Sequence, residues 1–201
     1  MIDLAFVFTV FMVTLGPIKV IPGFYKFTKD FEPSECRRLA LRGVFFATVI
    51  SLAIALVMPV ISKSWLVTPD DLRIAGGILL FAAAFDLLRP GSASSEPQDP
   101  PNHPAISPIA IPIVITPWGA AAIMIAMGLA SKHAEVVAVL SNLLFIMALN
   151  LGGMWFARHI IAMTGVVFFK IVGWVFAVLQ SGLAIHIIFV ALKNLGFVAQ
   201  P

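Results

Sequence analysis

Two pairs of prolines are the residues in this chain whose type and spacing could do chemistry. Pro17 and Pro22 lie five residues apart, and Pro112 and Pro117 repeat this spacing further along the chain. Because proline removes a backbone donor and clashes with the preceding turn, we expect both apolar segments to be broken there. A broken membrane helix frees carbonyl and amide groups that can bind an ion or a polar solute. The pattern therefore predicts a binding site at two broken helices.

Other polar and small residues could complete this site. Lys19 would attract an anion or stand in for a coupling cation, although its long side chain could instead extend to the membrane surface. Asn142 and Asn150 share a helix face, where they could line a cavity or only form interhelical hydrogen bonds. The predicted substrate-binding residues are Pro17, Lys19, Pro22, Gly23, Pro112, Thr116, Pro117, Gly119, Asn142, Asn150 and Gln180.

The prolines also have a structural interpretation, because many proline and glycine kinks in membrane helices only shape packing. We favour a site because the proline pairs match in both halves of the chain. A transport site predicts that Lys19, Thr116, Asn142, Asn150 and Gln180 converge on one cavity. A structural role predicts that they face separate neighbours and that the largest exposed grooves are apolar.

Composition identifies an integral membrane protein. Of the 201 residues, 60% are hydrophobic and 11% are charged, whereas a soluble domain carries roughly a quarter charged residues. The apolar segments approach the ~20 residues that a hydrocarbon core requires, the third being short. We expect six transmembrane helices, at Leu4–Tyr25, Leu39–Ile61, Ile74–Leu88, Ile106–Ala130, Val136–Phe156 and Ile171–Leu192. The fold class is all-α, with the first and fourth helices broken at the proline motifs.

Residues 91–105 are rich in proline and serine, which predicts a flexible cytoplasmic linker. It separates an N-terminal repeat of three helices, residues 1–90, from a C-terminal repeat of three helices, residues 106–201. An odd number of spans in each half gives the halves opposite orientations. Two motif pairs support a repeat, because Pro17 and Pro112 are offset by 95 residues and Arg73 and Lys170 by 97. We expect an inverted-topology repeat.

These motifs resemble those of a known family. Residues 16–22, Gly-Pro-Ile-Lys-Val-Ile-Pro, are similar to its pattern Asn-Pro-Ile-Gly-x-Ile-Pro, and residues 73–77 match its Arg-Ile-Ala-Gly-Gly core. Residues 108–119 are similar to Pro-Leu-Ala-Ile-Pro-x-x-x-Gly-Pro-Gly, and residues 177–180, Ala-Val-Leu-Gln, resemble a Val-Gln motif near the end of the family pattern. Together they resemble the MarC family of six-helix inner-membrane proteins. The resemblance implies a small polytopic protein of the bacterial cytoplasmic membrane, distantly akin to LysE- and TerC-type transporters, and implies no substrate.

The chain departs from the family pattern at the predicted site. Gly16 replaces an asparagine, Lys19 replaces a glycine, and Thr116-Pro117-Trp118-Gly119 replaces Gly-Pro-Gly. Either the substrate differs from that of typical members, or the site has become a structural kink.

Basic residues lie at helix ends, so the net charge of +3 does not predict nucleic-acid binding. With the N-terminus outside, eight face the cytoplasm, namely Lys26, Lys29, Arg37, Arg38, Arg42, Arg89, Arg158 and Lys170. Four face outward, namely Lys63, Arg73, Lys132 and Lys193. This asymmetry predicts an N-out, C-out protein. The start of the chain lacks the basic region and cleavage site of a signal peptide, so we expect the first helix to be retained.

The sequence contains no hydrolase, phosphate-binding or metal-binding motif of the kinds considered, so we expect neither catalysis nor a cofactor. The favoured function is secondary transport or export of a small polar solute or ion. The alternative is a non-transporting membrane protein, a partner-binding or regulatory subunit, in which the kinks are structural. A narrow ion channel ranks third. Small-residue helix faces are compatible with a homodimer.

Overall fold

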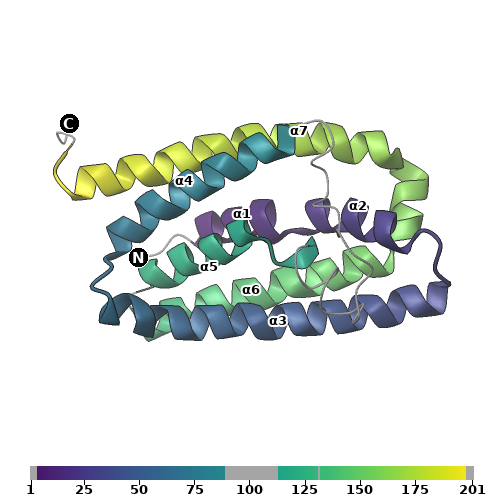
Figure 1. Cartoon of the computed structure of the whole chain (residues 1–201), viewed down its shortest axis with the longest axis horizontal. Coiled ribbons are helices and arrows are strands. Elements are labelled where there is room, and N and C mark those ends of the chain that lie inside the picture. The colour runs from purple at the N-terminus through teal and green to yellow at the C-terminus, as the bar shows by residue number, and fades with distance from the viewer. Residues whose placement is uncertain (1–3, 89–112, 131, 198–201) are drawn as a thin grey trace.

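The computed structural model describes residues 4–88, 113–130 and 132–197. Every regular element with printed bounds in these ranges is a helix (Figure 1). The helices are α1 (Leu4–Leu15), α2 (Pro17–Thr28), α3 (Pro33–Ser64), α4 (Pro69–Leu88), α5 (Pro117–Leu129), α6 (His133–Trp155) and α7 (Ala157–Asn194). The predicted all-α class is confirmed.

Four helical stretches in the described ranges are long and apolar enough to cross a membrane. They are Leu4–Thr28, which comprises α1 and α2, then Pro33–Ser64, His133–Trp155 and Val167–Asn194. Helix α5 is apolar but shorter. Helix α4 has the length of a span, but Asp70, Asp71 and Arg73 lie near its start.

Four helices begin earlier than their apolar sequence predicts: α3 at Pro33, α4 at Pro69, α6 at His133 and α7 at Ala157. Helix α4 starts at Pro69 because Thr68 and Asp71 cap it. Thr68 donates to Asp71 Oδ2 from its N–H at 2.9 Å and from its Oγ1 at 2.6 Å. In return, Asp71 N–H donates to Thr68 Oγ1 at 3.2 Å. Helix α7 starts at Ala157 and turns at Gly165, whose φ of 74° lies in the left-handed region that favours glycine. A continuous apolar run therefore marks only part of each of these helices.

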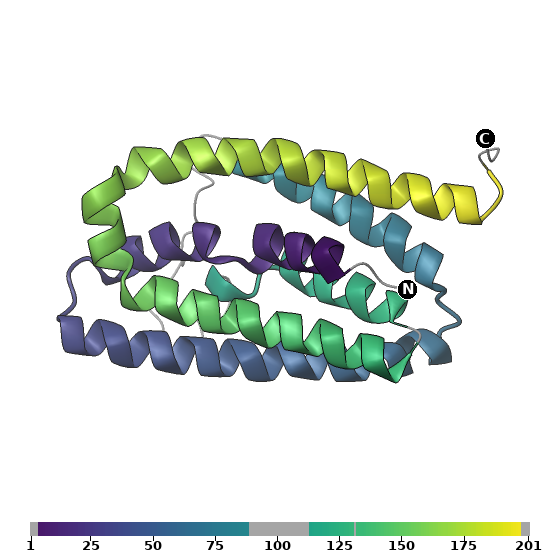
Figure 2. The ribbon, with the colours of Figure 1, turned by 180° about the vertical axis from the view of Figure 1, so that it is seen from behind.

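The long helices lie roughly side by side, with α1, α2 and α5 between them (Figures 1 and 2). Helix α4 packs along α7, and α3 packs along α6. The chain runs in opposite directions in the two members of each pair, and α5 also runs opposite to α1 (Figures 1 and 2). The short central helices therefore carry the chain breaks into the interior.

Paired glycines allow α4 to approach two neighbours closely. A Cβ on Gly76 would lie 2.2 Å from Ile125 Cδ1 of α5, and a Cβ on Gly77 would lie 2.5 Å from Ile188 Cγ1 of α7. Such contacts require the absence of a side chain, as small residues at membrane helix interfaces commonly do.

Candidate binding site at the broken helices

The first membrane span is broken at Gly16. Helix α1 ends at Leu15 and α2 begins at Pro17, and Gly16 between them is extended, with φ −73° and ψ 166°. A Cβ at Gly16 would lie 2.0 Å from the Met12 carbonyl oxygen, so the local fold requires glycine. The break predicted at Pro17 is confirmed.

Helix α2 continues through Pro22, so the break in this span lies at Gly16 and Pro17 and not at the second proline. Pro22 lacks only the N–H that would bond the Ile18 carbonyl, and one missing hydrogen bond can be tolerated inside a packed membrane protein. Pro17 causes less conflict with the helix because it occupies the first position of α2, where no intrahelical donor is needed.

The second break precedes α5. Thr116 is extended, with φ −94° and ψ 159°, and Pro117 starts the helix. Thr116 Oγ1 accepts a hydrogen bond from Gly119 N–H at 3.1 Å, so this side chain satisfies one of the amides that the helix start leaves free. Pro112, the first proline of this pair, lies outside the described residues.

The two breaks meet through Leu15 and Gly119. A Cβ on Gly119 would lie 2.2 Å from Leu15 Cδ2, and Leu15 is buried. Nearby, a Cβ on Gly23 would lie 3.6 Å from Ile113 Cγ2. The end of α1 and the start of α5 therefore pack together, and predicted site residues from both halves of the chain are adjacent.

Helix α6 closes the other side of the first break. Asn150 Nδ2 donates to the Leu15 carbonyl oxygen at 2.7 Å, and the Asn150 side chain is 0% exposed. One turn further, a Cβ on Gly153 would lie 3.1 Å from Ile21 and from Pro17. Asn150 is thus the predicted site residue with the most direct contact to the break.

Lys19 lies on the side of α2 that faces the second break. Gly23, one turn beyond Lys19 on the same helical face, is next to Ile113. Pro17 and Ile21, which contact α6, lie on the opposite face of α2. Lys19 is half-buried, and its N–H donates to the Gly16 carbonyl oxygen at 3.3 Å.

Two other predicted residues have neighbours away from the breaks. Asn142 Nδ2 lies 3.5 Å from the carbonyl oxygen of Leu4, at the start of α1. Gln180 Nε2 donates at 2.8 Å to the carbonyl oxygen of Leu80, between α7 and α4. The described structure therefore gathers Leu15–Pro17, Thr116, Gly119 and Asn150, and places Asn142 and Gln180 elsewhere.

The helix ends at the breaks carry opposite partial charges. Helix α1 ends there with free carbonyls, which give a negative end, while α2 and α5 begin there with free amides, which give positive ends. Such an arrangement can bind a cation at one helix end and an anionic group at the others.

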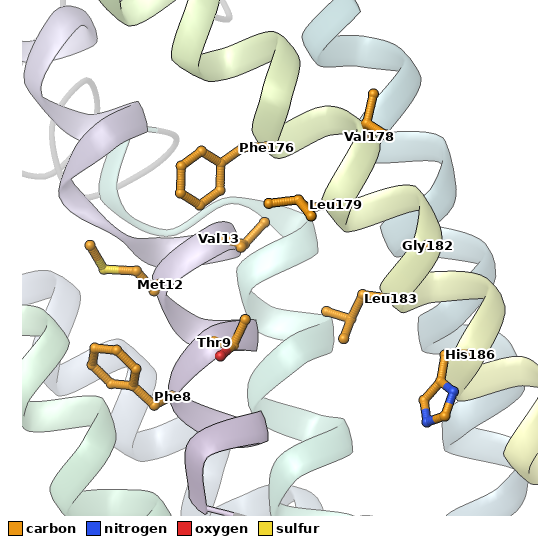
Figure 3. A pocket seen from close by; sticks show the side chains of 10 residues that line it. All are labelled: Phe8, Thr9, Met12, Val13, Phe176, Val178, Leu179, Gly182, Leu183 and His186. Atoms are coloured by element: carbon orange, nitrogen blue, oxygen red, sulfur yellow. The ribbon is translucent and has the colours of Figure 1, made fainter.

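An apolar groove lies between α1 and α7 (Figure 3). Its volume is about 660 Å³, and its lining includes Phe8, Met12 and Val13 of α1 and Phe176, Leu179 and Leu183 of α7. Thr9 and His186 are the polar side chains in its lining, and Thr9 Oγ1 donates to the Ala5 carbonyl oxygen at 2.8 Å. The sequence did not predict this groove, because it depends on the separation of two packed helices.

At the predicted cytoplasmic end, Arg158 ties α7 to the end of α2. Its Nη2 donates to the carbonyl oxygens of Thr28, at 2.8 Å, and Phe31. The same nitrogen lies 3.4 Å from Cys36 Sγ. The sequence showed Arg158 only as a topology signal, because its acceptors are distant main-chain groups.

A family model described as MarC family integral membrane protein matches residues 2–195. The chain belongs to the MarC family. It is 30% identical over 139 residues to the UPF0056 membrane protein MJ1677 of Methanocaldococcus jannaschii, which covers 64% of this chain and 68% of the relative. A second protein of that organism, MJ0972, is 28% identical over 148 residues, covering 68% of this chain and 65% of the relative.

A relative from Escherichia coli strain K12 is named UPF0056 inner membrane protein YhgN, and it is 27% identical over 112 residues. That match covers 55% of this chain and 57% of the relative. The resemblance of the sequence motifs to the MarC family is confirmed, and none of these names states a transported solute. No solved structure matches significantly.

Proposed function

We propose that this MarC protein is a secondary transporter or exporter of a small polar solute or ion, with its site where the two broken helices meet near the bilayer midplane. One observation carries the proposal: Leu15 touches the second half of the chain through both its side chain and its main chain. Its side chain packs at Gly119, and its carbonyl accepts from Asn150. Main-chain groups freed inside a membrane need such partners, and a ligand can replace them.

The chemistry of the breaks suits a solute that carries charge. The starts of α2 and α5 favour an anionic group, and the end of α1 favours a cation. Lys19 lies on the face of α2 directed to the second break, where it would add a positive charge for an anion. A charged side chain within a membrane segment commonly marks a substrate or ion pathway.

An inverted repeat would supply the motion that transport needs. Its support is the packing of matching helices, since α3 lies along α6 and α4 along α7, each pair with opposite chain directions (Figures 1 and 2). Rocking of residues 1–90 against residues 106–201 would alternate access to the site. The proposed orientation is N-out and C-out, in a bacterial cytoplasmic membrane.

The alternative is a non-transporting membrane protein in which the kinks fix packing. Two observations favour it: the groove between α1 and α7 is apolar, and Asn142 and Gln180 bond to separate helices. A partner-binding or regulatory subunit would need no polar cavity. The two proposals therefore differ in whether the breaks bind a solute.

Thermal unfolding of the detergent-purified protein in the presence of ions, amino acids, organic acids or phosphates distinguishes the transporter from the non-transporting alternative. A solute present at a hundred times its dissociation constant stabilises the folded state by ~2.7 kcal/mol. We expect one solute class to raise the Tm of the wild type, and Lys19→Gln to abolish that shift. Lys26→Gln is the matched control, because Lys26 lies on the same face of α2 but is exposed near its end. If no solute shifts the Tm and Lys19→Gln behaves as the wild type, the non-transporting alternative is favoured.

A further inference from the structure

The carboxamide of Asn150 is half satisfied. Its Nδ2 donates to the Leu15 carbonyl oxygen at 2.7 Å, but its Oδ1 has no hydrogen-bond partner among the described residues. The side chain is 0% exposed, so bulk water does not reach it. A buried acceptor without a donor is unfavourable in a packed interior, where nearly all polar groups are paired. A bound group that pairs with this oxygen would remove the deficit.

The main chain next to Asn150 also offers acceptors. In a continuous helix the Val13 carbonyl would accept from the N–H of residue 17, but Pro17 has none. The Leu15 carbonyl uses one lone pair for Asn150 and keeps a second. Both carbonyls lie in the last turn of α1, at the negative end of its dipole. The end of α1 therefore presents main-chain oxygens that lack a full set of helical donors.

We propose that Asn150 Oδ1 and the carbonyl oxygens of Val13 and Leu15 bind a small monovalent cation, Na⁺, at the end of α1. The role of this cation as the coupling ion of transport rests on the proposed function. Its binding to the protein does not. Oxygen ligands suit hard cations, and half-helix carbonyl ends are a known means of holding Na⁺ in broken membrane helices. The tight burial of Oδ1 favours a small ion.

The ligand chemistry argues against a divalent metal and a proton. All three proposed ligands are neutral, and the described residues contain no group of three or more His, Cys, Asp or Glu side chains that could hold a metal. A divalent ion usually requires carboxylates to balance its charge. An asparagine amide does not take up protons near neutral pH, so it cannot act as a proton carrier.

The position of Lys19 is compatible with a cation at this place. Gly153 of α6, one turn beyond Asn150, lies against the side of α2 that carries Pro17 and Ile21. Lys19 lies on the opposite face of the helix, which has a diameter of about 10 Å with its side chains. The lysine charge and the proposed cation thus have α2 between them, and the lysine faces the second break.

Gln180 provides a matched control within the same chain. Like Asn150, it is 0% exposed, donates one hydrogen bond to a main-chain carbonyl and has an unpaired side-chain oxygen. Unlike Leu15, its acceptor Leu80 lies inside the continuous helix α4. Removing Gln180 therefore tests the loss of a buried amide without touching the break.

The experiment measures the Tm of the purified protein in NaCl and in choline chloride at equal ionic strength, with equilibrium binding of ²²Na⁺ as a second readout. We expect Na⁺ to raise the Tm of the wild type and of Gln180→Leu with one bound ion per chain, and Asn150→Leu to lose both effects. Asn150→Asp loses the donor to the Leu15 carbonyl but keeps an oxygen and adds a negative charge, so its Tm should depend on Na⁺ more steeply than that of the wild type. This variant tests the site even if Asn150→Leu fails to fold.

Equal Tm values in NaCl and choline chloride for the wild type, or a Na⁺ response in Asn150→Leu that matches the wild type, would overturn the site. Solute uptake into liposomes separates this result from the fate of the proposed function. If uptake proceeds but no Na⁺ binds, the proposed cation site is wrong and the proposed transport function stands. If Na⁺ binding depends on Asn150 but the protein moves no solute, the cation site stands and its coupling role is wrong.

Discussion

Leu15 occupies the space that a side chain at Gly119 would need. A Cβ at position 119 would lie 2.2 Å from Leu15 Cδ2 and 3.0 Å from Leu15 Cγ. These residues belong to different halves of the chain, and each adjoins a break in its own helix. The contact therefore holds the two breaks at one place, and several tests of the site follow from it.

Gly119→Ala should destabilise the protein by about 1–3 kcal/mol, because Leu15 is buried and its side chain cannot move away freely. Leu15→Ala in the same chain should recover part of this loss by freeing the space, which a double-mutant cycle of thermal unfolding would measure. Gly152→Ala is the control, since nothing lies within 4 Å of a Cβ there. Strictly additive effects of the two substitutions would contradict the contact.

The sequence predicted the break at Pro17 because the effect of proline on a helix is local. It could not predict which groups satisfy the broken ends, because these come from distant parts of the chain. Asn142 and Asn150 illustrate the limit: their spacing correctly places them on one face of α6 that contacts α1. Eight residues of helix span about 12 Å, so Asn142 contacts the start of α1 at Leu4 and Asn150 contacts its end at Leu15.

The close contact of α4 with α7 gives a second test. A Cβ at Gly77 would lie 2.5 Å from Ile188 Cγ1 and 3.0 Å from the Ala184 carbonyl oxygen, which belongs to the backbone and cannot rotate away. Gly77→Val should therefore force the helices apart and destabilise the protein by about 1–3 kcal/mol. Gly182→Val on α7 should have a much smaller effect on the Tm, because a Cβ there meets nothing within 4 Å. Similar losses in both variants would argue against the close helix contact at Gly77.

Thr68 and Asp71 give α4 a dependence on pH. The pKa of Asp71 lies below its usual value of 3.8, mainly because the Thr68 hydroxyl donates to the carboxylate and also because the Thr68 N–H does. A carboxyl group with a lowered folded-state pKa stabilises the protein above its unfolded pKa, and this stabilisation is lost as the pH falls through the folded pKa. The Tm difference between wild type and Asp71→Asn should therefore be present at pH 7 and shrink in acid. In a Thr68→Val background the Tm difference caused by Asp71→Asn should be smaller at pH 7. A Tm difference that does not change with pH would contradict the hydrogen bonds between Thr68 and Asp71.

Arg158 should shield the only cysteine of the chain. Cys36 is 8% exposed, and Arg158 Nη2 lies 3.4 Å from its sulfur while donating to the carbonyls of Thr28 and Phe31. Arg158→Ala would leave those carbonyls without their charged donor, a change worth about 1.5–3 kcal/mol, and open a path to the thiol. We expect maleimide to label Cys36 several times faster in this variant. Arg38→Ala, at an exposed arginine on α3, should leave the rate unchanged, and equal rates in all three proteins would exclude the shielding.

The orientation in the membrane can be tested with single cysteines, starting from Cys36→Ser. Asp30, with a side chain 81% exposed, lies between α2 and α3, at the end that gathers most of the basic residues. Leu66, 87% exposed, lies between α3 and α4 at the opposite end of α3. Because basic loops remain in the cytoplasm, a membrane-impermeant maleimide added to intact cells should label Leu66→Cys and not Asp30→Cys. Disrupting the cells should make Asp30→Cys reactive, and labelling of Asp30→Cys alone in intact cells would reverse the proposed N-out, C-out topology.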